Sequence, residues 1–148
     1  MTEKQSATAP VVRISRLLPA TPQEVFDAWT DPESVKIWMC PGAQTATTVE
    51  LDARVGGSFR VVMRDERGDF THTGEYREIR PPQRLVFTWR SNATRNEETL
   101  VTIELYPRGD DATELILTHE RLPDAPAVVG HTQGWQGIIE KFARYLDR

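Results

Sequence analysis

The sequence predicts an α+β fold in which an antiparallel sheet of about seven strands is covered by one long C-terminal helix. Three observations predict it. Two helix-start signals lie close together between residues 21 and 41, apolar and polar residues alternate through the middle of the chain, and the last segment repeats apolar residues at helical spacing. We expect residues 1–10, which are small and polar, to be a disordered tail, and residues 11–148 to form a single domain.

Two short helices are predicted directly after a first strand at Val11–Leu18. Thr21 can cap the first helix, with Pro22 at its first position and Glu24 completing a capping box. Asp31 repeats the start signal for a second helix, which ends by Pro41. Two helices joined without a spacer form a bent arm, and its large aromatic side chains must pack against the rest of the fold. These are Phe26, Trp29 and Trp38.

Six further strands are predicted between Pro41 and Asp124, where apolar residues recur at every second position. The apolar positions fall in segments 49–51, 59–63, 70–76, 85–89, 101–105 and 115–119, with turn residues between them. Short connections predict an antiparallel meander. Charged residues between the apolar positions indicate one covered face and one solvent-exposed face.

A helix of some twenty residues is predicted at the C-terminus, with its apolar side chains on one face, and we expect this face to pack on the covered side of the sheet. Gly130, Gly134 and Gly137 form a stripe beside that face, and each lowers helix stability by about 1 kcal/mol relative to alanine. The stripe indicates either close packing against another element or room left for a ligand.

Composition excludes several classes of function. The net charge is −4 and the basic residues are scattered, so no nucleic-acid partner is expected. No apolar segment is long enough to span a bilayer and no signal peptide is evident, so we expect a cytoplasmic protein without membrane insertion. Cys40 is the single cysteine, which excludes an internal disulfide. Nucleotide-binding and serine-hydrolase motifs are absent from the sequence, and we predict no cofactor.

Seven sequence motifs, in this order, resemble a known family. They are residues 25–33 (VFDAWTDPE), Trp38 with Pro41, residues 56–60 (GGSFR), residues 74–76 (GEY), residues 81–85 (PPQRL), residues 118–120 (THE) and residues 134–135 (GW). The match covers residues 11–148 and resembles bacterial proteins similar to the C-terminal domain of the activator of the heat-shock protein ninety ATPase. These belong to the helix-grip (START-like, SRPBCC) superfamily, with lipid-transfer START domains, the birch-pollen allergen and polyketide cyclases.

The resemblance implies a sheet curled around the long helix, with a cavity between them that is open at one end. It does not imply one function. We predict a binding protein for an apolar or amphipathic small molecule. The alternatives are a cyclase- or hydrolase-type enzyme using the same cavity, with His119 or His131 as acid or base, and a co-chaperone-like stimulator of a chaperone ATPase. The oligomeric state and the ligand are not predicted.

Large apolar side chains and three histidines on the covered phase are the candidate cavity residues. The predicted lining is Phe59, Met63, Tyr76, Phe87, Trp89, His119, Trp135 and Ile138, with Trp38 and Pro41 near the mouth and with His72 and His131 able to reach the cavity. Each histidine is either a hydrogen-bonded core residue or a ligand contact. No metal site is predicted, because the histidines lack the paired spacing of metal ligands.

Overall fold

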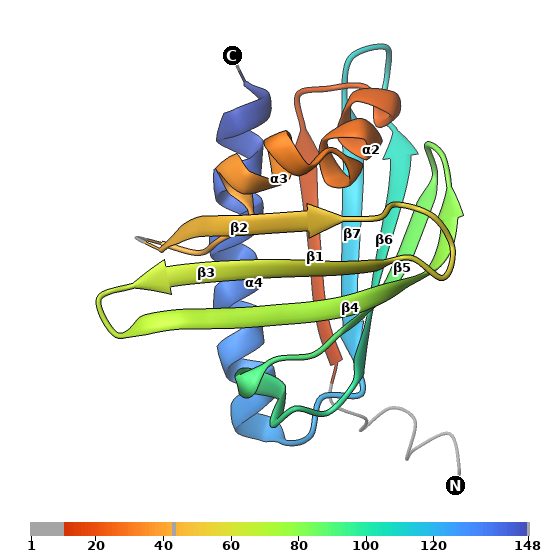
Figure 1. Cartoon of the computed structure of the whole chain (residues 1–148). Coiled ribbons are helices and arrows are strands. Elements are labelled where there is room, and N and C mark those ends of the chain that lie inside the picture. Colours follow the sequence, from red (N-terminus) through yellow and green to blue (C-terminus); the bar gives the residue numbers. More distant parts are fainter. Residues whose placement is uncertain (1–10, 43, 148) are drawn as a thin grey trace, which may run out of the picture.

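The computed structural model describes residues 11–42 and 44–147. The predicted tail, residues 1–10, lies outside the described residues. The elements in chain order are β1 (Val11–Leu18), α2 (Pro22–Thr30), α3 (Pro32–Trp38), β2 (Thr45–Leu51), β3 (Ser58–Asp65), β4 (Gly68–Arg80), β5 (Arg84–Trp89), the 3₁₀ helix η1 (Asn92–Thr94), β6 (Thr99–Pro107), β7 (Thr113–Glu120) and α4 (Ala125–Leu146). Figure 1 shows β2, β3 and β4 passing in front of α4 and the other strands to one side of it, with α2 and α3 at the end where α4 finishes.

The bent arm forms as its capping residues predict. The backbone N–H of Glu24 donates to Thr21 Oγ1 at 3.2 Å, and Glu24 Oε1 accepts from the Thr21 N–H at 2.8 Å. Asp31 caps α3 by accepting from the N–H of Glu33. These bonds satisfy donors that a helix start otherwise leaves unpaired, so the two helix starts are fixed locally by sequence.

The described strands form one antiparallel sheet in the order β1-β7-β6-β5-β4-β3-β2. The six predicted meander strands are neighbours in sequence order, and β1 pairs along β7, with Val12 opposite His119 and Leu18 opposite Thr113. The first strand therefore joins the far end of the meander, and β2 forms the other edge.

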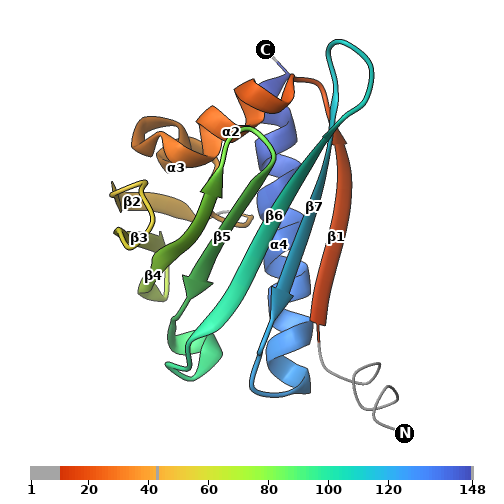
Figure 2. The same ribbon diagram turned by 90° about the vertical axis from the view of Figure 1, so that its right-hand side faces the viewer.

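The sheet is strongly curved, and α4 lies in its concave face (Figure 2). Strands β2, β3 and the first half of β4 cross in front of the helix in Figure 1, whereas β5, β6, β7 and β1 run nearly along it. A register shift in the β4–β5 pairing between Tyr76 and Glu78 accompanies this change of direction. Asp124 caps α4, which buries Trp135, Ile138, Ile139, Phe142 and Ala143 against the sheet and the arm.

Candidate ligand-binding pocket

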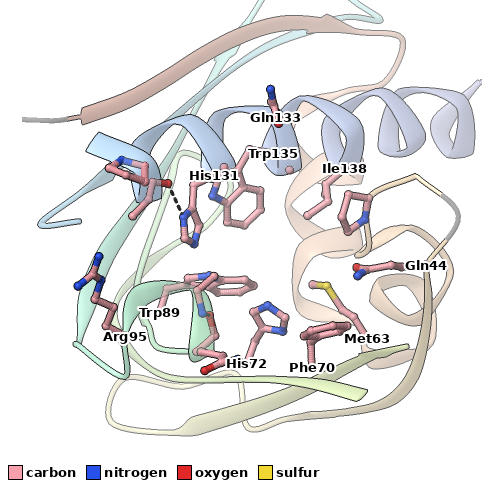
Figure 3. A pocket seen from close by; sticks show the side chains of 18 of the residues that line it. Gln44, Met63, Phe70, His72, Trp89, Arg95, His131, Gln133, Trp135 and Ile138 are labelled. Carbon is pink, nitrogen blue, oxygen red and sulfur yellow. Dashed lines mark hydrogen bonds between the residues drawn. The ribbon is translucent and has the colours of Figure 1, made fainter. Parts of the chain in front are cut away.

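A pocket of about 680 Å³ lies between the first half of α4 and the curled part of the sheet. Its walls come from β3, β4, the end of β5, the segment around η1, the loop before β2 and α4, as Figure 3 shows from close by. Small-molecule sites in proteins typically measure 300–1,000 Å³. The space between sheet and helix is thus large enough for a small organic molecule.

The interior of the pocket is apolar and largely aromatic. Trp89 from β5 and Trp135 from α4 lie with ring centroids 5.1 Å apart, and Met63, Phe70 and Ile138 complete the apolar walls. Trp89, Trp135 and Ile138 are each at least 96% buried, so little of their surface faces bulk water. A flat apolar molecule placed here would exchange water for aromatic and thioether contacts.

Two ion pairs hold the polar rim. Arg95, in a left-handed backbone conformation just after η1, pairs with Asp124, which also caps α4 by accepting from the N–H of Ala127. Arg67 pairs with Asp65 at 2.7 Å. The Arg67 guanidinium, and then a hydrogen bond from Gln44, hold the pKa of the Asp65 carboxyl well below its usual range. The charges of the rim therefore compensate each other.

His119 has a hydrogen-bond partner on each ring nitrogen. The Trp135 indole N–H donates to Nδ1 at 3.0 Å, so the proton of the neutral ring is on Nε2, which donates to Thr99 Oγ1 at 2.7 Å. Thr99 in turn donates to the carbonyl of Trp89. His119 is fully buried, and burial lowers its pKa to about 3. His119 therefore lies behind the pocket wall. Its hydrogen bonds hold Trp135 directly and Trp89 through Thr99.

The other two histidines line the pocket from opposite sides (Figure 3). His72 on β4 lies with its ring centroid 4.9 Å from that of Trp89, and burial lowers its pKa to about 4. His131 on α4 places Nδ1 2.8 Å from the carbonyl oxygen of Ala127, and burial lowers its pKa as well. Both rings are therefore neutral at physiological pH.

The glycine stripe on α4 divides into two kinds of position. A Cβ added at Gly130 or Gly134 would meet no atom within 4 Å, and both residues line the pocket. A Cβ added at Gly137 would lie 3.4 Å from Pro41 Cβ and 3.6 Å from Gly42 N. Of the two alternatives that the sequence left open, close packing thus applies to Gly137 and free space to the other two.

The structure brings part of the predicted lining together and not the rest. Met63, His72, Trp89, His131, Trp135 and Ile138 surround the pocket, with Pro41 at its edge. Phe59, Tyr76 and Phe87 do not reach it, because their rings pack on each other with centroids 5.4–6.3 Å apart. They surround a separate void of about 20 Å³, enough for roughly one water molecule. His119 was also predicted to line the pocket, but it lies behind the pocket wall.

The predicted place of Trp38 near the mouth is wrong. Its side chain is fully buried, with ring centroids 4.7 Å from Trp29 and 4.3 Å from Phe142. These three rings fill the space between the arm and the second half of α4. The arm therefore closes its end of the fold with core packing, and the pocket lies alongside the first half of α4.

Several pocket residues were not predicted. They are Gln44, Arg67, Phe70, Ser91, Asn92, Ala93, Arg95, Asp124, Pro126, Ala127 and Gln133. Phe70 shares the phase of His72 in the β4 alternation and could have been found from it. The segment 91–95 carries no periodic signal, so only its turn could be predicted.

Two further site types are not found in the described residues. No group of three or more histidine, cysteine, aspartate or glutamate side chains there could hold a metal ion. No helix among them is both long and apolar enough to cross a membrane. The predicted absence of metal stays a prediction, which elemental analysis of untagged protein would test.

A curved antiparallel sheet wrapped around a C-terminal helix, with a pocket between them, defines a helix-grip protein, as predicted. The structure is similar to that of protein CV1439 from Chromobacterium violaceum, with a TM-score of 0.83 and 26% identity over 94% of this chain and 98% of that one. It is similar also to the AHSA1 protein of Silicibacter pomeroyi, with a TM-score of 0.82 and 26% identity over 93% and 97% of the two chains.

Residues 19–147 match the family model of the activator of Hsp90 ATPase homolog 1-like proteins, and the chain belongs to this family. CalU16 from Micromonospora echinospora has the same fold, with a TM-score of 0.71 and 23% identity over 92% of this chain and 75% of that one. No curated protein matches the sequence. The family membership is confirmed, whereas chaperone contact and cyclase or hydrolase chemistry stay predictions.

Proposed function

We propose that the protein binds an apolar or amphipathic small molecule in the pocket between the sheet and the first half of α4. The observation that carries the proposal is a pocket of about 680 Å³ whose interior is lined by Met63, Phe70, Trp89, Trp135 and Ile138. Burying apolar ligand surface against such walls is favourable by roughly 25 cal/mol per Å² before the costs of association.

The backbone of α4 supports this proposal independently of the aromatic walls. Gly130 and Gly134 face free space, yet alanine at either position would raise helix stability by about 1 kcal/mol without a clash. A helix with a purely structural role gains nothing from these two glycines. A helix that leaves room for a ligand needs them.

The hydrogen bonds of the histidines favour binding over acid–base catalysis. A catalytic histidine needs a free nitrogen and an orienting group, usually a carboxylate. Both nitrogens of His119 are used within the fold, and in the described part of the chain no carboxylate bonds to His72 or His131. Asp124, the carboxylate on the pocket rim, is paired with Arg95.

A neutral fluorescent probe, N-phenyl-naphthylamine, tests the proposal. We expect saturable binding of one probe per chain, with a change in tryptophan fluorescence because Trp89 and Trp135 form the walls. Binding should raise the free energy of unfolding by about 2.7 kcal/mol at a hundredfold excess over Kd.

Ile138→Trp, which fills the pocket, should abolish binding at a cost of roughly 1–3 kcal/mol in stability. The matched control is Val129→Trp on the exposed face of α4, where the native side chain is 57% exposed. Val129→Trp should bind as the parent does. Absence of binding to the parent, or unchanged binding in folded Ile138→Trp protein, would overturn the proposal.

A further inference from the structure

The hydrogen bond of His131 to its own helix fixes which of its nitrogens carries the proton. Nδ1 lies 2.8 Å from the carbonyl oxygen of Ala127, and a carbonyl only accepts, so Nδ1 holds the hydrogen. Nε2 of the neutral ring is then a lone-pair acceptor. It makes no hydrogen bond to another described residue, and Figure 3 shows it turned into the pocket.

The surroundings keep this ring neutral. Burial lowers the pKa of His131. The ring nearest to it is the neutral imidazole of His119, at a centroid distance of 4.9 Å. From the other elements, β4 contributes neutral His72 and the rim contributes the paired charges Arg95–Asp124 and Arg67–Asp65. No carboxylate among the described residues bonds to the imidazole to stabilise a proton on Nε2.

Among the other polar side chains of the lining, buried Ser91 accepts a hydrogen bond from the backbone N–H of Ala93, and His72 has a buried Nδ1 without a hydrogen-bond partner. Asn92 and Gln133 are exposed, so water competes for their hydrogen bonds. His131 is half-buried beside Trp135 and close to the aromatic walls. A hydrogen bond formed with Nε2 is therefore more shielded from water, which makes a missing donor more costly there than at the rim.

We propose that His131 determines the ligand class: an uncharged, flat apolar body bearing a hydrogen-bond donor, above all a hydroxyl group, that reaches Nε2. This inference rests on the proposed function and names the ligand chemistry of the same pocket. A hydroxyl donates to Nε2 while its ring lies between the walls. An ether of the same shape presents only a lone pair, and a carboxylate presents a charge to an acceptor, so both are disfavoured.

Three compounds that share one ring system test this selection: naphthol, its methyl ether and naphthoate. In the parent near neutral pH we expect naphthol to bind about five- to tenfold more tightly than the ether, the value of one neutral hydrogen bond. Naphthoate should bind more weakly than either. His131→Phe keeps a ring but removes the acceptor, and it should bring the ratio of naphthol to ether affinity close to one.

Thr132→Val is the matched control, because Thr132 makes the same kind of bond to its own helix, through Oγ1 to the Val128 carbonyl, and does not line the pocket. Its affinity ratio should equal that of the parent. The ratio cancels any general effect of a substitution on stability.

The outcomes separate this inference from the proposed function. A parent that binds naphthol and ether equally tightly, or a loss of preference in His72→Phe but not in His131→Phe, overturns the role of His131 while the pocket stands. A parent that binds none of the three compounds and no neutral probe overturns both. If His131→Phe does not fold, the affinity ratio in His72→Phe decides: a retained preference for naphthol supports the role of His131, and a lost preference overturns it.

Discussion

The substitution Gly134→Ala tests whether α4 leaves room for a ligand or has only a packing role. The added Cβ meets no atom within 4 Å, and the native φ lies outside the left-handed region. Gly134→Ala therefore gains helix propensity without strain. We expect the free energy of unfolding to rise by about 0.5–1 kcal/mol. For a chain of 148 residues this corresponds to an increase in Tm of roughly 1.5–3 °C.

The same substitution places carbon in the pocket. Gly134→Ala should weaken binding of the neutral probe, and Gly134→Leu should weaken it by at least about tenfold, because the longer side chain occupies space beside the aromatic walls. Urea unfolding followed by circular dichroism gives the stability, and titration with the probe gives the affinity.

Gly137→Ala is the matched control for both measurements. It makes the same change on the same helix, but its Cβ would touch Pro41 and it does not line the pocket. We expect a smaller gain in stability and an unchanged affinity. A destabilised Gly134→Ala protein would refute the assignment of free space at this position. A folded Gly134→Leu protein that binds the probe as tightly as the parent would refute its role in the pocket.

Three further predictions concern stability. Thr21→Ala removes the cap of α2 and should lower the free energy of unfolding by about 0.5–2 kcal/mol in urea denaturation; no change would show that the capping box contributes nothing. Trp29→Ala should lower it by about 3–5 kcal/mol, because Trp29 is 3% exposed and its ring contacts Trp38; a variant as stable as the parent would show that the arm is loosely packed. Burial lowers the pKa of folded His72 to about 4, so its contribution to stability is complete above pH of about 6.5 and is lost as the pH falls toward 4. In His72→Phe the pH dependence of stability across this range should be shallower by up to about 1.4 kcal/mol per pH unit, and identical slopes would contradict the burial of a neutral imidazole.

Much of the fold follows from local signals. Thr21 and Asp31 mark the two helix starts through bonds that span three residues or fewer, and the alternation of the strands sets which face is covered. The pairing of β1 with β7 could not be predicted in the same way, because it joins residues such as Val12 and His119 that are far apart in the sequence. The family resemblance implies a sheet curled around the long helix, and the pairing of β1 with β7 is known from the structure alone.

The sequence predicted which side chains face α4, but it did not predict which of them line the pocket. Phe59 and Met63 lie on the same phase of β3, yet Met63 lines the pocket and Phe59 packs against Tyr76 and Phe87. Alternation states which side of a strand faces α4. It does not give the distance between the strand and the helix at each position, and a ligand fits only where that distance is large. That distance depends on the curvature of the sheet, which arises from all strands together.

The three histidines show why a sequence alone could not rank them. All three fall on the apolar phase of their elements, and the difference between them is the number of nitrogens that the fold leaves without a partner. Thr99 and Trp135 use both nitrogens of His119, and Ala127 uses one nitrogen of His131, whereas Nδ1 of His72 is buried without a partner. A buried polar group that the fold satisfies completely fixes the packing around it. A nitrogen that the fold leaves unpaired beside the pocket gains a partner only from what enters. The bond from Nδ1 to Ala127 makes Nε2 of His131 an acceptor, whereas no hydrogen bond of Nδ1 fixes the tautomer of His72, so we expect His131 to select the hydrogen-bonding group of the ligand.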